Sequence, residues 1–93
     1  MKIDFEKLPC YTDIRKSEKR EMNVKFDFAN EMYIHGGGVA MGALALKIYN
    51  AQGETEYTEQ ECHLMLQFLH GGSFAPIFIE SLDELLKEGQ ERE

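Results

Sequence analysis

The sequence predicts an α+β domain that is mainly helical, with four helices and a small N-terminal β-hairpin-like arm. Three observations support this class. The glycine groups Gly36–Gly38 and Gly71–Gly72 separate segments in which apolar residues recur at helical spacing. Thr58 and Glu61 have the spacing of a capping box, which marks the start of a helix. Residues 1–24 alternate weakly between polar and apolar side chains, as extended segments do.

Length and composition favour a single small domain. The chain has 93 residues, and a chain of this size buries about 60–65% of its unfolded surface. Hydrophobic residues make up 43% of it, which suffices for one core without a metal or a disulfide. We expect one domain over residues 1–93, made of an extended arm at 1–24, a helical body at 25–88 and a frayed tail at 89–93.

The arm is expected to hold two short strands. Leu8-Pro9 stops any helix there, because proline disfavours α geometry in the residue before it. Residues 11–14 form the first candidate strand, and the charged run 15–21 is typical of a turn. The second strand is expected at about 21–24.

The chain after this turn permits two structures. Met22, Val24, Phe26 and Phe28 alternate with period two, which indicates a strand. Val24, Phe28 and Met32 also recur at four-residue spacing, and Asn23 is an acceptable N-cap, which indicates a helix. We assign the strand at about 21–24 and a first helix at about 25–34. This helix has apolar residues on both faces, more than one core can cover.

The second helix is expected over residues 39–51 and should end before Gly53. Helices commonly end with a residue in the left-handed backbone conformation, which glycine adopts readily. Leu46 and Tyr49 flank its core-facing stripe, and small residues give its other face room for a neighbouring helix. The core-facing stripe consists of Met41, Leu44, Ala45 and Ile48, and the small residues are Ala40, Gly42 and Ala43.

The third and fourth helices are expected to be antiparallel across Gly71–Gly72. Thr58 begins the third helix, Ser73 can cap the fourth, and Pro76 is tolerated in a first turn because its amide has no helical partner. The apolar stripe of the third helix is Cys62, Met65, Leu66 and Leu69. That of the fourth is Phe74, Ile77, Phe78, Leu82 and Leu85.

Charge is divided unevenly along the chain, whose net charge is −7. Residues 1–25 hold seven basic and five acidic side chains, so they carry +2, and the remaining residues carry −9. An acidic body repels phosphate backbones, which disfavours nucleic acid as a partner. The one basic cluster is Arg15, Lys16, Lys19 and Arg20. A solvated loop is the favoured interpretation of it, because Glu18 and Glu21 interrupt the cluster.

No motif predicts catalysis or a cofactor. His35–Gly38 resembles the HGGG segment of lipases, and Gly71–Ala75 nearly matches a GxSxG nucleophile elbow. An elbow needs a strand before its serine, whereas a helix is expected here. GGGVAMG lacks the GK[ST] of a phosphate-binding loop. The acids around the third helix start are ordinary partners of a helix dipole.

The cysteines and histidines do not predict a metal site. Cys10 and Cys62 lack CxxC spacing and are expected to be reduced, and no pair among His35, His63 and His70 has zinc-site spacing. No apolar run reaches the ~20 residues that span a bilayer. The N-terminus also lacks the apolar segment of a signal peptide. A cytoplasmic protein without metal, cofactor or membrane contact is the expectation.

The order of signals resembles a known layout: a helix, a Gly stop, a capped third helix and a Pro-initiated last helix. It resembles short proteins of phages and prophage-like elements, many of them in Bacteroides-type genomes. Such proteins tend to be encoded near genes for phage structure and assembly, and the resemblance implies no activity and no catalytic residue. The residues that carry the resemblance are Ile3, Asp4, Phe5, Leu8, Pro9, Tyr11–Ile14, Ala43–Ala45, Lys47–Tyr49, Gly53, Glu56–Glu59 and Glu61.

We therefore expect a non-enzymatic protein–protein interaction module of such an element, possessing no catalytic site and serving as a tail or head assembly accessory factor. An alternative is a small regulator that uses the basic arm at 15–20. A small hydrolase or metal enzyme is a third and disfavoured reading. Self-association is also predicted, through the opposite charges of arm and body and through exposed Phe26 and Tyr33. The alternative is that the arm folds back onto its own acidic body.

Overall fold

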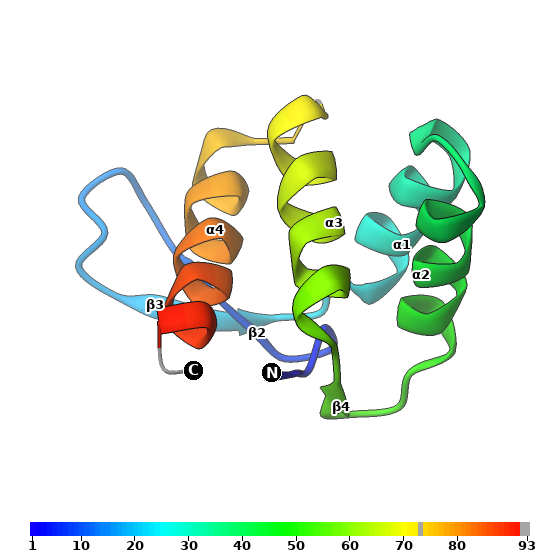
Figure 1. Cartoon of the computed structure of the whole chain (residues 1–93). Coiled ribbons are helices and arrows are strands. Elements are labelled where there is room, and N and C mark those ends of the chain that lie inside the picture. The colour runs from blue at the N-terminus through cyan, green and yellow to red at the C-terminus, as the bar shows by residue number, and fades with distance from the viewer. Residues whose placement is uncertain (73, 92–93) are drawn as a thin grey trace.

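The computed structural model describes residues 1–72 and 74–91, and these form four helices and four short strands (Figure 1). The α+β, mainly helical class predicted from the sequence is confirmed. The helices are α1 (Lys25–His35), α2 (Val39–Asn50), α3 (Glu59–Gly71) and α4 (Pro76–Glu91). The strands are β1 (Lys2–Ile3), β2 (Leu8–Tyr11), β3 (Lys19–Met22) and β4 (Thr55–Glu56).

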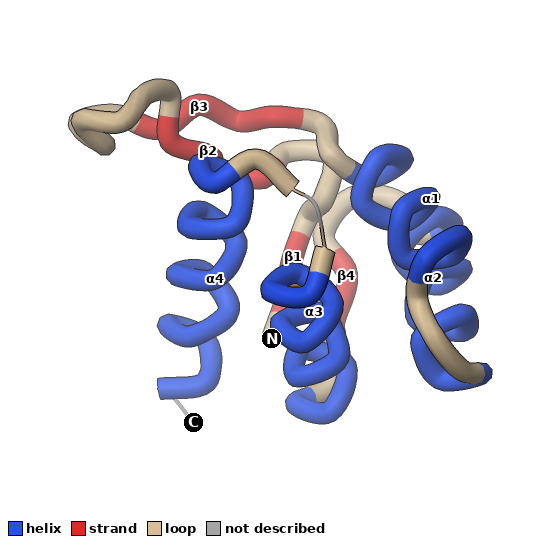
Figure 2. The backbone as a smooth tube through the Cα atoms, turned by 90° about the horizontal axis from the view of Figure 1, so that it is seen from above, coloured by secondary structure: helices blue, strands red, loops and turns tan. Residues whose placement is uncertain are grey.

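The helices lie side by side with α3 in the middle. The antiparallel pair α1 and α2 lies on one side of α3, and α4 lies on the other, antiparallel to α3 as predicted (Figures 1 and 2). The β2–β3 hairpin contacts α4 and crosses it, and its loop extends past that helix (Figure 2). The α1–α2 pair is therefore at the opposite end of the molecule from the hairpin loop.

The two strands of the hairpin lie upstream of their predicted positions at 11–14 and 21–24. Leu8 and Cys10 are buried, so the inward alternation already begins at Leu8. Pro9 between them is tolerated because both strands of a two-stranded sheet are edge strands. The register pairs Leu8 with Met22, Pro9 with Glu21, Cys10 with Arg20 and Tyr11 with Lys19, in antiparallel order.

A second antiparallel sheet connects the N-terminus to the linker between α2 and α3. β1 and β4 pair Lys2 with Glu56 and Ile3 with Thr55. The sequence gives no sign of β4, because two residues are too short for a periodic pattern. The pairing joins segments more than fifty residues apart and closes the arm onto the helical body.

α1 begins at Lys25 as predicted and ends at His35. Asn23 is not its N-cap. Val24 holds that position and makes no capping hydrogen bond through its side chain. The Val24 N–H donates to the Phe5 carbonyl at 2.8 Å, which fixes Val24 as the last residue before the helix. Asn23 instead accepts from the Lys25 N–H at 3.3 Å.

Glycine is required at the turn between α1 and α2. Gly36 caps α1, and its N–H donates to the Met32 carbonyl at 2.8 Å. A Cβ atom at Gly36 would overlap that carbonyl oxygen and the side chain of Met41. Gly38 precedes α2 with a φ of +89°, a conformation that other residues rarely adopt.

Gly53 has the left-handed backbone expected of it, with a φ of +69°. It does not end the helix, however, because α2 stops at Asn50 and Ala51 is its C-cap. Gly53 instead turns the linker, and its N–H donates to the Glu6 carboxylate at 3.0 Å.

α3 begins with the predicted capping box. The Glu61 N–H donates to the Thr58 hydroxyl at 3.1 Å, and the Thr58 N–H donates to the Glu61 carboxylate at 2.8 Å. α4 begins at Pro76, the proline expected in its first turn, and continues to Glu91, so the helix extends into residues 89–91, which were expected to fray. Positions 92–93 and the expected cap Ser73 lie outside the described residues.

Buried side chains from the arm, the helices and the linker form one cluster. The predicted stripes of α2 and α3 are largely confirmed, and Leu66 alone of them is only half-buried. On α4, Leu86 is fully buried and the predicted Leu85 is only half-buried, since Leu86 lies one turn after buried Leu82. The cluster comprises Ile3, Phe5, Leu8, Cys10, Phe28, Ala29, Met32, Met41, Leu44, Ala45, Ile48, Tyr57, Cys62, Met65, Leu69, Leu82 and Leu86.

Candidate protein-interaction surface

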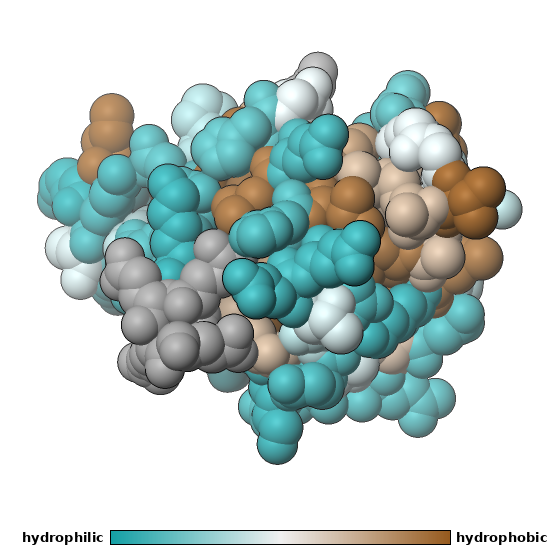
Figure 3. All heavy atoms as spheres, in the orientation of Figure 1, coloured by the Kyte–Doolittle hydropathy of each residue, from teal (hydrophilic) through white to brown (hydrophobic). Residues whose placement is uncertain are grey.

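Large apolar side chains are exposed together on the outer side of the α1–α2 pair. Phe26 and Tyr33 of α1 are 57% and 60% exposed, and Leu46 and Tyr49 of α2 are 47% and 51% exposed. Val39, at the start of α2, is 90% exposed. We name these five residues the α1/α2 face. Figure 3 shows apolar residues gathered at this end of the molecule.

A shallow groove of about 330 Å³ runs through the α1/α2 face. The rings of Phe26 and Tyr49 both line it, with centroids 6.2 Å apart and an interplanar angle of 62°, an edge-on arrangement that aromatic pairs favour. Its lining is almost entirely apolar and consists of Phe26, Ala29, Asn30, Tyr33, Ala45, Leu46 and Tyr49.

The helical repeat explains why these side chains point outward. In α1, Phe28, Ala29 and Met32 are buried, which leaves Phe26 and Tyr33 on another side of the helix. The predicted exposure of these two aromatic residues agrees with their positions. The contribution of α2 to this surface was not predicted, because the sequence pattern places Leu46 and Tyr49 beside the core-facing stripe.

A signal for the α2 contribution was present in the sequence. Val39, Gly42, Leu46 and Tyr49 recur at spacings of three, four and three residues, a second stripe beside the core-facing one. A helix that is apolar on nearly all sides is normally covered on all sides. α2 instead presents this second stripe to solvent.

The α1/α2 face carries no charged side chain. Lys47, the one charged residue of α2, pairs with Glu61 of α3 at 2.8 Å and lies 4.9 Å from the Tyr57 ring centroid, so it points toward α3. Lys25 lies beside Ala51, whose carbonyl accepts from its ammonium at 3.1 Å. A surface of this kind avoids the desolvation of charge when another apolar surface covers it.

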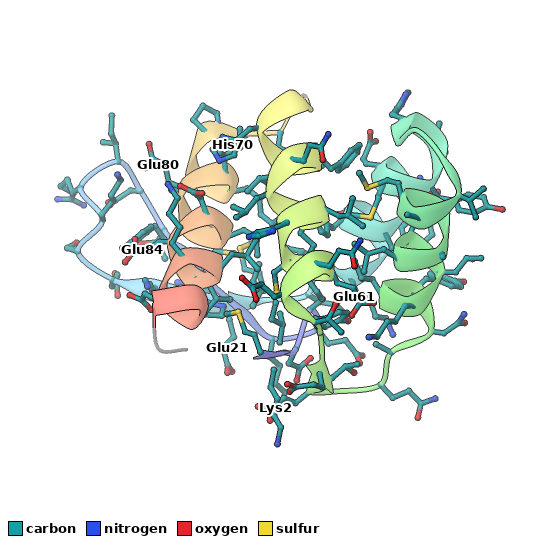
Figure 4. The ribbon with its side chains drawn as sticks, in the orientation of Figure 1. Lys2, Glu21, Glu61, His70, Glu80 and Glu84 are labelled. Carbon is teal, nitrogen blue, oxygen red and sulfur yellow. The ribbon has the colours of Figure 1, made fainter. Side chains whose placement is uncertain are left out.

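The basic residues of the arm are largely paired within the chain. Lys16 lies 2.5 Å from the carboxylate of Glu80, and Lys19 lies 3.9 Å from that of Glu84. Both acids extend from α4 on the side of the hairpin (Figure 4). Lys19 also lies 4.8 Å from the ring centroid of Tyr11. The arm thus folds onto its own acidic body, which was the alternative to intermolecular pairing.

The remaining arm cations add little to a binding site for anions. The Arg15 guanidinium donates two hydrogen bonds to Asp13 Oδ2, from Nη2 at 2.8 Å and from Nε at 3.2 Å. Arg20 lies on β3, whose residues are all exposed, and it makes no ion pair with the described part of the chain. Exposed pairs of this type contribute about 0–1 kcal/mol to stability, and the acid in each pair offsets the positive charge that would attract a phosphate backbone.

The histidines and cysteines are spread over the molecule. His70 contacts Asp83 of α4 at 3.1 Å, and His35 lies 3.6 Å from Glu31. Cys10 and Cys62 are both buried, and neither forms a disulfide. Within residues 1–72 and 74–91, no group of three or more His, Cys, Asp or Glu side chains is arranged to hold a metal ion.

A wider depression of about 710 Å³ lies beside α1 and the end of α3. Asp27, Glu31 and His35 line one wall at one-turn spacing, and Phe68 and Phe74 line another. All three polar side chains are exposed. Exposed acids on one helix face are common in a chain of this charge, so the depression defines no ligand.

Comparison with known proteins gave no match to a protein-family model, to a curated protein or to a solved structure. In the described part of the chain, no helix combines the length and the apolar character needed to cross a bilayer.

Proposed function

We propose that this chain is a non-enzymatic protein-interaction module that binds an apolar helix of another polypeptide on the α1/α2 face. The observation that carries the proposal is the contiguous exposure of Phe26, Tyr33, Leu46 and Tyr49 around an uncharged groove. Apolar patches of several hundred Å² on small proteins commonly mark interaction sites.

The geometry of the groove favours a helix as the bound element. Two antiparallel helices form its walls, and an amphipathic helix places apolar residues at i, i+3, i+4 and i+7 along such a groove. Aromatic side chains are also enriched at the centres of protein interfaces, where they bury much area with few rotatable bonds. Phe26, Tyr33 and Tyr49 would supply this contact.

We place the module in a phage or prophage-like element, as a cytoplasmic accessory factor of tail or head assembly. This setting rests on the resemblance in layout described above. The neighbouring genes test it directly: genes for tail or head components next to this one would support the setting. A position inside an operon of metabolic genes would count against it.

Site-specific photo-cross-linking tests the binding surface. A photoreactive phenylalanine analogue at Leu46 should give a discrete protein adduct in cells that express the chain. The same analogue at Gln60, an exposed position on α3, serves as the matched control. Equal labelling from both positions, or none from Leu46, would show that the α1/α2 face is not the binding surface.

A further inference from the structure

We infer that the polypeptide bound on the α1/α2 face is a second copy of this chain, with the two α2 helices antiparallel across a two-fold axis. This inference rests on the proposed function, because it names the partner of the same surface. Three features of the described residues carry it: the spacing of the outer stripe of α2, the area it leaves exposed, and the distribution of charge.

The outer stripe of α2 has the symmetry that a two-fold interface needs. Val39, Gly42, Leu46 and Tyr49 are separated by three, four and three residues, so the stripe has the same spacing in both directions. An axis crossing α2 at the level of Leu44 places Leu46 of each copy against Gly42 of the other. The same axis places Val39 against Tyr49. In a two-fold interface each contact occurs twice, and this spacing satisfies that condition.

The residues that meet are complementary in size. Space is open at Gly42, since a Cβ atom there would meet nothing within 4 Å. The side chain of Leu46 in the second copy can fill this space, in the manner of a knob in a hole. Phe26 and Tyr33 of α1 would then lie along the edge of the paired helices. A glycine opposite a leucine permits the two helices to approach closely.

The exposed area supplies a large part of what a dimer interface requires. A whole aromatic side chain covers about 200 Å², so Phe26, Tyr33 and Tyr49, at 57%, 60% and 51% exposed, leave roughly 340 Å² uncovered. A standard interface buries about 800 Å² on each partner. Val39, Leu46 and the backbone of α2 supply further area, so the α1/α2 face can provide much of what a specific interface requires.

Charge also favours this arrangement over an arm-to-body dimer. Each copy carries −7, so two copies repel each other wherever acidic surfaces approach. The α1/α2 face holds no acid, while Lys16 and Lys19 of the arm are already paired with Glu80 and Glu84 of their own chain. Salt should therefore strengthen the dimer by screening repulsion. An arm-to-body dimer would be weakened by salt.

The first test measures the dimer directly by sedimentation equilibrium of the whole chain. Leu46→Glu should raise the dissociation constant of the dimer about 100-fold or more, because a charge would be buried without a partner. Ile14→Glu is the matched control: Ile14 is 93% exposed in the hairpin loop, and this variant should dimerise as the parent does. A second variant, Gly42→Leu, should also dissociate the dimer, and at protein concentrations where the parent is monomeric its melting temperature should not be lower, because leucine is the better helix former.

The second test fixes the register by mixing two cysteine variants under mild oxidation. Val39→Cys mixed with Tyr49→Cys should give a disulfide between two chains, and neither variant alone should do so efficiently. A dimer that cross-links only through two Val39→Cys chains would overturn the antiparallel arrangement. The native cysteines are buried and serve as an internal background in the parent chain.

The two proposals fail in different ways. A parent chain that stays monomeric at high protein concentration and high salt overturns the second-copy inference. If Leu46 still cross-links to a different protein in cells, the proposed function survives that result. If the parent is monomeric and Leu46 gives no adduct, both proposals are wrong.

Discussion

Ser81 of α4 accepts a hydrogen bond from the backbone N–H of Tyr11 on β2, with 3.0 Å between the two atoms. The Ser81 hydroxyl donates in turn to the Ile77 carbonyl at 2.7 Å. Ser81 is only 2% exposed. This one side chain therefore fixes the hairpin against α4, and it gives the backbone N–H of Tyr11 an acceptor.

Removing this link should destabilise the protein. Ser81→Ala leaves the Tyr11 N–H without its acceptor, and the free energy of unfolding should fall by about 1–2 kcal/mol. Urea titration followed by circular dichroism measures the change. Ser17→Ala in the exposed hairpin loop is the control, and it should change stability by no more than about 0.5 kcal/mol. Equal effects at the two serines would mean that the link is not stabilising.

Two tyrosines should respond in opposite ways to loss of the hydroxyl. The Tyr57 hydroxyl is buried, and none of the described groups forms a hydrogen bond with it. Tyr57→Phe should therefore leave stability unchanged or raise it by up to about 1 kcal/mol. The Tyr11 hydroxyl donates to Glu84 at 2.5 Å, so Tyr11→Phe should lower stability. A clear loss of stability in Tyr57→Phe would contradict this assignment.

Tyr57 should also make stability fall at high pH. Burial, with smaller contributions from Glu61 and Asp4, raises the pKa of Tyr57 from 10.0 to about 12. The folded state thus holds its proton more tightly than the unfolded state. The stabilisation is complete below pH 10 and is lost as pH rises toward 12. Unfolding monitored between pH 9 and pH 12 should show this decline, and Tyr57→Phe should lack that part of it.

The capping box predicts a loss of stability in acid. Burial alone would raise the pKa of Glu61, but the Lys47 ammonium and the Thr58 N–H outweigh it, and the pKa lies below its ordinary value of 4.5. A lowered folded-state pKa stabilises the protein above pH 4.5, and this is lost as pH falls through the folded-state value. Glu61→Gln keeps the cap but loses the charge, so its deficit relative to the parent should shrink between pH 7 and pH 3.

Glu59→Gln, in the same helical turn, is the control for the acid experiment. Glu59 forms neither a cap nor an ion pair with the described residues, so Glu59→Gln should change the stability at pH 7 less than Glu61→Gln does. Thr58→Ala, which removes the cap itself, should cost about 1 kcal/mol at neutral pH. A deficit of Glu61→Gln that stays constant with pH would show that the carboxylate charge is not the cause.

The α1–α2 turn should tolerate alanine at one glycine and not at its neighbour. Gly36→Ala forces a Cβ atom against the Met32 carbonyl and the Met41 side chain, so it should lower the free energy of unfolding by about 1–3 kcal/mol. Gly37→Ala meets nothing within 4 Å and should be neutral or slightly stabilising. Thermal melts of the two variants compare them directly. Similar melting temperatures of the two variants would contradict the claim that Gly36, unlike Gly37, has no space for a Cβ atom.

Local signals in the sequence determined most of the helical framework. Thr58, Glu61 and Pro76 mark helix starts through interactions within a few residues, and glycine at 36–38 and at 71–72 marks the ends. These interactions act within about one helical turn, so the sequence alone predicts where these helices start and end. The hairpin was misplaced by about two to three residues at each strand because its register depends on burial of Leu8 and Cys10 against distant helices.

Only the tertiary structure decided which apolar residues remain on the surface. The sequence shows that α1 and α2 are apolar on more than one side, but it cannot say which side another helix covers. Packing of α3 and α4 away from the outer stripe leaves Leu46 and Tyr49 exposed. The same packing brings Glu80 and Glu84 to the hairpin and pairs its lysines. Long-range contacts set both outcomes, because burial and ion pairing depend on which distant segments meet.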